Sequence, residues 1–172
     1  LCENNEGYRN LIKLVSLGFT EGFYSKPRID RELLKKYHNG IIALSACLAG
    51  EIPQLLLNGE YEKAKETALW YSEVFGENNY FLELQDHGID EQKRVNPQII
   101  RISEETGIGL VATNDVHYIK HDDFKMHKVL LCIQTGSKIT EDNPIEFKTN
   151  EFYLKSAEEM AELFGSTPEA LT

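Results

Sequence analysis

The sequence predicts an α/β fold, a sheet or a barrel, with parallel strands and helices outside. Three short apolar segments, at 41–44, 80–84 and 109–112, each read as a buried strand. Helical patterns separate these segments, and strand–helix alternation is typical of parallel strands with right-handed crossovers. The 41% hydrophobic composition fits a globular protein. Three strands are too few to close a barrel.

Helices are predicted from apolar periodicity and from their end signals. Asp30 is expected to cap the second helix, and Ser156 with Glu159 forms a capping box for the last one. The Thr106-Gly107 pair ends the helix before the third strand. The predicted helices span residues 5–17, 30–37, 51–57, 60–75, 90–105, 122–134 and 156–164.

The composition and the net charge indicate which kinds of partner and location the chain favours. A formal net charge of −10 over 172 residues repels phosphate backbones, so strong DNA binding by this chain alone is not expected. No run of about 18 apolar residues predicts a membrane span. Cys2, Cys47 and Cys132 are far apart and unpaired in pattern, which favours a reducing cytoplasm. Because the chain begins at Leu1 and stops at Thr172, we expect it to be a piece of a longer protein.

Polar side chains follow each predicted strand. Cys47 comes after the first strand, Asp86 and His87 after the second, and Asp115 and His117 after the third. The carboxyl ends of parallel strands share one edge of a sheet, so these side chains are expected to converge there. Thiolate, imidazole and carboxylate groups bind zinc, manganese and similar divalent ions. In an extended segment, residues two apart point to the same side, which would let Asp115 and His117 reach one ion.

Simpler interpretations compete with a metal site. A cysteine after a buried strand often only packs, and residues 86–88 read equally well as a turn closed by the Asp86 side chain. Asp115 alone could cap a short helix. Cys132 is expected in the core. The other histidines are assigned to solvated surfaces or structural contacts: His38, His121 and His127.

Several linked motifs stand in the order found in a known family. They lie at residues 6–11, 44–51, 82–88, 112–118, 131–136 and 152–160. On these motifs the chain resembles the DnaE-type family of alpha subunits of bacterial DNA polymerase III, and the resemblance covers essentially its whole length. The segments Gln134-Thr135-Gly136 and 153–160 belong to the polymerase family rather than to PHP (polymerase and histidinol phosphatase) proteins at large.

The resemblance implies a fold and a site. It implies that residues 1–135 are the C-terminal part of a PHP domain, a distorted (β/α)7 barrel holding up to three metal ions, with its first strands missing. Residues 136–172 would connect it toward the polymerase palm. Cys47, Asp115 and His117 match family ligands, and His87, with Asp86, lies in a motif near the site. Further ligands are expected before Leu1, and the magnesium-binding palm carboxylates after Thr172.

The resemblance also implies a function and partners. The parent would be a DNA-directed DNA polymerase that acts in replication on DNA and deoxynucleotides, with the sliding clamp among its partner subunits. Its PHP region would be a 3′–5′ exonuclease using zinc, manganese or magnesium, while this piece alone would be inactive. Two alternatives stay open: a PHP scaffold without activity, and a free-standing PHP phosphoesterase.

Overall fold

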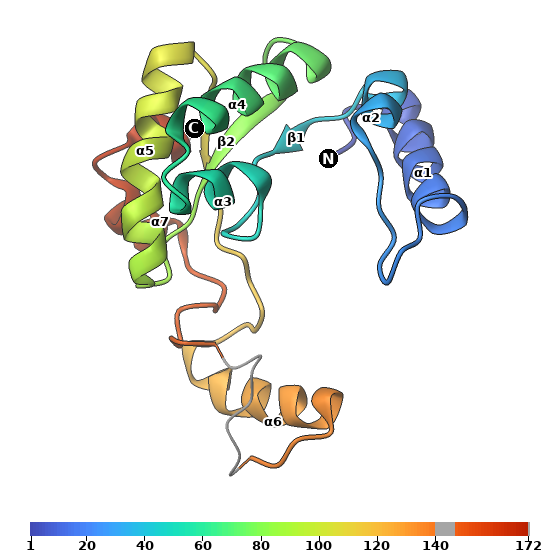
Figure 1. Cartoon of the computed structure of the whole chain (residues 1–172). Coiled ribbons are helices and arrows are strands. Elements are labelled where there is room, and N and C mark those ends of the chain that lie inside the picture. The colour runs from blue at the N-terminus through green and yellow to red at the C-terminus, as the bar shows by residue number, and fades with distance from the viewer. Residues whose placement is uncertain (140–146, 172) are drawn as a thin grey trace.

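The computed structural model describes residues 1–139 and 147–171, and it contains a parallel sheet covered by helices (Figure 1). The strands are β1 (Ala43–Leu44), β2 (Tyr80–Leu84) and β3 (Leu110–Ala112), in the order β1-β2-β3. Ala43 pairs with Tyr80 and Leu82 with Leu110, both in parallel register. The predicted α/β class and the parallel strands are therefore confirmed.

The first strand is shorter than predicted because its beginning pairs with another segment. Ile41 forms an antiparallel bridge with Cys2. The Ile42 N–H donates to the Leu1 carbonyl at 2.9 Å. These bonds satisfy the backbone of residues 41–42 outside the parallel ladder, so β1 retains only two residues.

The helices lie close to the predicted ranges, and their end signals explain where they begin. Asn4 caps the first helix, Asp30 caps the second through the Leu33 N–H, and Ser156 with Glu159 forms the predicted capping box. One start differs: residues 121–123 form a short 3-10 turn before the helix that was predicted from 122. The helices are α1 (Asn5–Thr20), α2 (Arg31–Tyr37), α3 (Glu51–Leu57), α4 (Tyr61–Phe75), α5 (Asp90–Thr106), α6 (Phe124–Thr135) and α7 (Ala157–Phe164), with 3-10 turns η1 (His121–Asp123) and η2 (Pro168–Leu171).

The core lies between the sheet and the helices α3, α4 and α5. β2 is buried on both faces, as expected for a central parallel strand. Phe164 of α7 and Ala170 of η2 belong to this same core, so the end of the chain packs beside the sheet rather than away from it. The fully buried apolar side chains include Ile52, Leu82, Leu84, Val95, Ile99 and Ile102.

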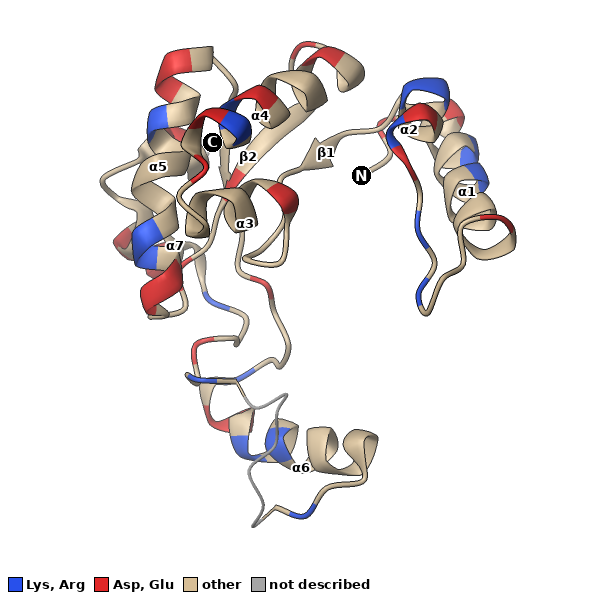
Figure 2. Ribbon diagram, in the orientation of Figure 1, with Lys and Arg blue, Asp and Glu red and all other residues tan. Residues whose placement is uncertain are grey.

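Helix α6 lies apart from the sheet (Figure 1). Cys132 is buried on it, as predicted, but Leu130 and Ile133 are exposed, because the Cys132 side of α6 faces its local neighbours rather than the main core. α6 carries lysines and no acidic residue, whereas acidic side chains are spread over α4, α5 and α7 (Figure 2). None of the helices within 1–139 and 147–171 is long and apolar enough to cross a membrane.

Candidate metal centre at the carboxyl edge of the sheet

Buried hydrogen bonds tie the carboxyl ends of the three strands together. The Glu83 N–H of β2 donates to Ser45 Oγ, which follows β1, at 2.8 Å. The Glu83 carboxylate accepts from the Thr113 hydroxyl after β3 and from Gln85 Nε2 at 2.9 Å. Glu83 and Gln85 are both buried. The strands therefore end at one common edge, as parallel pairing requires.

This network was not foreseen from the sequence. The apolar pattern places Glu83 in the second predicted strand, and an acidic residue among the apolar residues of a buried strand is itself a signal. Burial of a carboxylate is costly unless it accepts hydrogen bonds, so Glu83 implied donors on neighbouring strands. Ser45 and Thr113 each lie two residues before a predicted ligand, Cys47 and Asp115. The network thus fixes where both ligand-bearing segments leave the sheet.

Replacing Thr113 by valine is expected to lower the free energy of unfolding by about 1–2 kcal/mol, because a buried carboxylate loses a donor while side-chain shape is kept. Denaturant unfolding followed by circular dichroism would measure the change. Thr20→Val is the control, because Thr20 is exposed at the end of α1 and its loss is expected to stay within about 0.5 kcal/mol. Equal free energies of unfolding for Thr113→Val and the unsubstituted chain would contradict a structural role for the network.

Asp115 and His117 come together just after β3. Asp115 Oδ1 lies 3.5 Å from His117 Nε2. The sequence analysis expected an extended segment here. Instead, Asp115 has a left-handed φ of 40°, so the chain turns at this residue. Asp is one of the residues that tolerates this conformation. The turn, rather than strand alternation, brings the two side chains together.

The separation of these two groups suits one ion. Ligand nitrogen and oxygen atoms about 2.1 Å from a zinc ion, at a tetrahedral angle, lie about 3.4 Å from each other. The observed 3.5 Å between Asp115 Oδ1 and His117 Nε2 matches this value. Both side chains are more than a third exposed, which leaves them accessible to solvent and substrate. The pair therefore fits as two ligands of a divalent ion.

Cys47 stands in a different neighbourhood on the same edge. It is half-buried and follows Ala46, which has a left-handed φ of 66°. Its carbonyl accepts from the Gly50 N–H at 2.8 Å, which closes a turn into α3. Cys47 lines a small cavity with Glu83 and Gln85, and the described residues contain no group of three or more His, Cys, Asp or Glu side chains able to hold a metal. Its role as a ligand stays a prediction.

His87 is held as a structural residue beside the pair. It is 1% exposed, and its Nε2 lies 3.0 Å from the Asn114 carbonyl oxygen. That oxygen can only accept, so Nε2 carries the proton, and Nδ1 accepts from Gln92 Nε2 at 2.9 Å. Neither ring nitrogen has a lone pair left for an ion. His87 therefore supports the backbone next to Asp115, while Asp86 Oδ1 accepts from the Gly88 N–H at 2.8 Å in the alternative turn considered from the sequence.

Aromatic rings surround His117. Its ring lies 4.6 Å from the Phe147 ring and 5.5 Å from the Phe152 ring, between centroids, and its backbone N–H donates to the Phe152 carbonyl. The His127 ring lies 5.8 Å away. Burial lowers the pKa of His127, and the charge of His117 lowers it further. The other histidines make local contacts: His38 with the Lys35 carbonyl, and His121 with Asn150.

Comparisons with known proteins identify the family of the chain. Residues 1–87 match the PHP domain family. The chain is similar to proteins named DNA polymerase III subunit alpha: 48% identical over 99% of its length in Borreliella burgdorferi, 50% over 98% in Treponema pallidum and 51% over 93% in Deinococcus radiodurans. It spans only 15%, 14% and 12% of these relatives. The PHP boundary at residue 135 stays a prediction.

The motifs read from the sequence and these relatives point to one family over nearly the whole chain. This chain belongs to the PHP domain family, and it is similar to a segment of bacterial proteins named DNA polymerase III subunit alpha.

Proposed function

We propose that the chain is the PHP segment of a replicative DNA polymerase III alpha subunit and that this segment serves as a metal-dependent 3′–5′ proofreading exonuclease. The observation that carries the proposal is the Asp115–His117 pair, whose facing atoms are 3.5 Å apart and open to solvent. The similarity to alpha subunits over 99% of the chain supports the parent enzyme. DNA, deoxynucleotides, the sliding clamp and a cytoplasmic location belong to this proposal through that parent.

The residues at the carboxyl edge of the sheet would have different roles in this function. Asp115 and His117 would hold a divalent ion (zinc, manganese or magnesium), and His87 would keep the Asn114–Asp115 backbone in place. Such an ion supplies Lewis-acid chemistry for phosphoester hydrolysis. Two protein ligands are fewer than the three of a typical catalytic zinc site. Cys47 and residues beyond the described part of the chain would have to complete the set.

The decisive experiment is an exonuclease assay of the full-length subunit carrying Asp115→Asn. We expect loss of metal-dependent degradation of a mispaired 3′ end, because the amide lacks the charge that binds a cation. Asp122→Asn is the matched control, since the Asp122 side chain is 99% exposed and is expected to leave activity unchanged. A chelator should abolish exonuclease activity in the unsubstituted subunit and in the Asp122→Asn control. Undiminished activity of Asp115→Asn would remove the proposal.

A second candidate is a PHP scaffold that supports the polymerase and partner subunits without hydrolysis. It is favoured by the absence, within 1–139 and 147–171, of any group of three candidate ligands. Elemental analysis of the purified full-length subunit discriminates the two functions. A subunit that contains no metal, and melts at lower temperature when Thr113 is replaced, would favour the scaffold. The three relatives reported above are each named as a polymerase subunit, which gives the free-standing phosphoesterase no support.

A further inference from the structure

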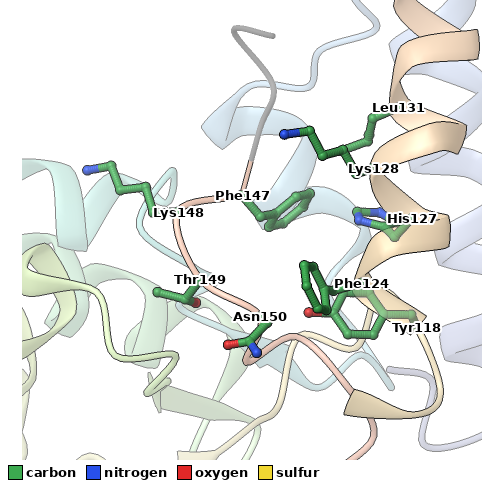
Figure 3. A pocket seen from close by; sticks show the side chains of 9 residues that line it. All are labelled: Tyr118, Phe124, His127, Lys128, Leu131, Phe147, Lys148, Thr149 and Asn150. Carbon is green, nitrogen blue, oxygen red and sulfur yellow. The ribbon is translucent and has the colours of Figure 1, made fainter. Parts of the chain in front are cut away.

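A second feature beside the candidate metal pair is a cavity of about 350 Å³ between α6 and the segment 147–150. Figure 3 shows its side chains facing one another across this space, with Phe124, His127 and Lys128 coming from α6. The cavity has the size of pockets that hold small organic ligands. Its lining residues are Tyr118, Phe124, His127, Lys128, Leu131, Phe147, Lys148, Thr149 and Asn150.

The walls are suited to a flat ring. Three aromatic side chains, from Tyr118, Phe124 and Phe147, line the space, and the His127 ring lies 5.0 Å from the Phe147 ring. The His127 imidazole makes ring contacts but has no hydrogen bond with the described residues. Nucleobases stack on aromatic rings and present polar edges that such a nitrogen can meet.

The polar side of the cavity is held in place by its neighbours. Thr149 Oγ1 donates to the His87 carbonyl at 2.7 Å, and Asn150 Nδ2 lies 2.8 Å from His121 Nε2. The first bond holds the segment against the buried His87, and the second holds it against His121 of η1. The Asn150 amide carries a further donor and an acceptor, which are the groups that read the edge of a base.

Two lysines line the cavity although the chain as a whole is acidic. Lys128 and Lys148 line it, and α6 contains no acidic residue. Lys148 Nζ is paired with Glu91 at 2.6 Å, yet an ammonium group has three donors and can meet a second oxygen. Lysines at the rim of an aromatic cavity favour a ligand that combines a flat ring with a phosphate.

The cavity also adjoins the candidate metal pair. Phe147 lies against the cavity and against His117, with 4.6 Å between the two ring centroids. His127 faces the cavity and lies 5.8 Å from His117. A base seated in the cavity would therefore lie next to the side chains that contact His117.

We propose that this cavity binds the base of a nucleotide 5′-phosphate, and that it receives the terminal nucleotide of a DNA strand whose phosphodiester lies at the Asp115–His117 pair. The inference rests on the proposed exonuclease function and names the subsite that holds its substrate. Phe147 is the central residue, because it contributes to the wall of the cavity and to the surroundings of His117.

The test measures the binding of deoxyadenosine 5′-monophosphate to the full chain in the presence of a chelator. Titration calorimetry and saturation-transfer NMR are the two methods of measurement. Removal of metal separates base binding from hydrolysis. We expect saturable binding that Phe147→Leu weakens about tenfold, the effect of losing one stacking ring. Phe19→Leu is the matched control, because Phe19 is exposed on α1 outside this cavity, and we expect unchanged affinity.

Further arms identify what is recognised. Deoxyadenosine alone should bind more weakly than the monophosphate but with the same dependence on Phe147, and Phe124→Leu should reproduce the loss if Phe147→Leu fails to fold. Binding of inorganic phosphate as strong as that of the monophosphate would overturn the base site, as would an equal loss in Phe19→Leu or no binding at all. Nucleotide binding without exonuclease activity in the full-length subunit would instead overturn the hydrolytic function and leave the base site standing.

Discussion

Replacing Leu82 by alanine is expected to lower the free energy of unfolding by about 3 kcal/mol, the cost of removing a fully buried leucine side chain from a close-packed core. Leu82 lies at the centre of β2 and has no exposed surface. It pairs with Leu110 of β3 and packs under the helices that cover the sheet. A chain of this size should show a melting temperature roughly 6–12 °C lower.

The control for Leu82→Ala is Leu130→Ala on α6. Leu130 is exposed, and alanine is at least as good a helix former as leucine, so its change is expected to stay within about 0.5 kcal/mol. Thermal and urea unfolding of the two variants measure the difference. Similar losses in both would mean that the sheet is not the centre of the core. Since Glu83 follows Leu82 directly, the same loss of packing is expected to loosen the edge that carries the candidate ligands.

Gly7→Ala is expected to destabilise the chain by about 2 kcal/mol, the scale of overpacking at a closed contact. Inside a helix this substitution normally stabilises by about 1 kcal/mol. The sign reverses here because a Cβ on Gly7 would lie 1.8 Å from the Gly40 carbonyl oxygen. That atom belongs to the backbone of the turn before β1, so it cannot move aside without shifting the bonds of residues 1–3 to that turn.

Gly18→Ala, in the same helix, is the matched control for Gly7→Ala. A Cβ there would lie 3.4 Å from the Arg28 carbonyl oxygen, which is close to ordinary contact. We therefore expect the helix propensity to dominate and the stability to be unchanged or slightly higher. Denaturant midpoints of both variants at equal protein concentration measure the pair. Equal midpoints would show that α1 does not pack on the Gly40 turn.

Local signals in the sequence predicted most of the secondary structure. The caps at Asp30 and Ser156 act through side chains and backbone groups within three residues, so no distant contact was needed to find them. The beginning of β1 was missed because the partner of Ile41 is Cys2, 39 positions earlier in the chain. The apolar run at residues 41–44 says that the segment is buried but not which neighbour it pairs with.

In the candidate site, too, local features could be predicted from the sequence and contacts between distant segments could not. Asp115 and His117 are two residues apart, so their closeness follows from one turn of the backbone. Cys47 follows a different strand and lines a cavity with Glu83 and Gln85, so its role as a ligand of the same ion stays a prediction. The sequence left His87 open between a residue near the site and a turn residue, and only the tertiary structure shows that Asn114 and Gln92 contact its two ring nitrogens.

The sequence by itself determined the α/β class, the order of helices and parallel strands, and the family, because periodicity, caps and contiguous motifs are written over short stretches of chain. The tertiary structure alone decided the Ser45–Glu83–Thr113 network and the aromatic cavity against α6. The physical reason is that these features depend on the distance between side chains far apart in sequence. Such distances are set by the packing of whole elements against one another, which no local pattern encodes.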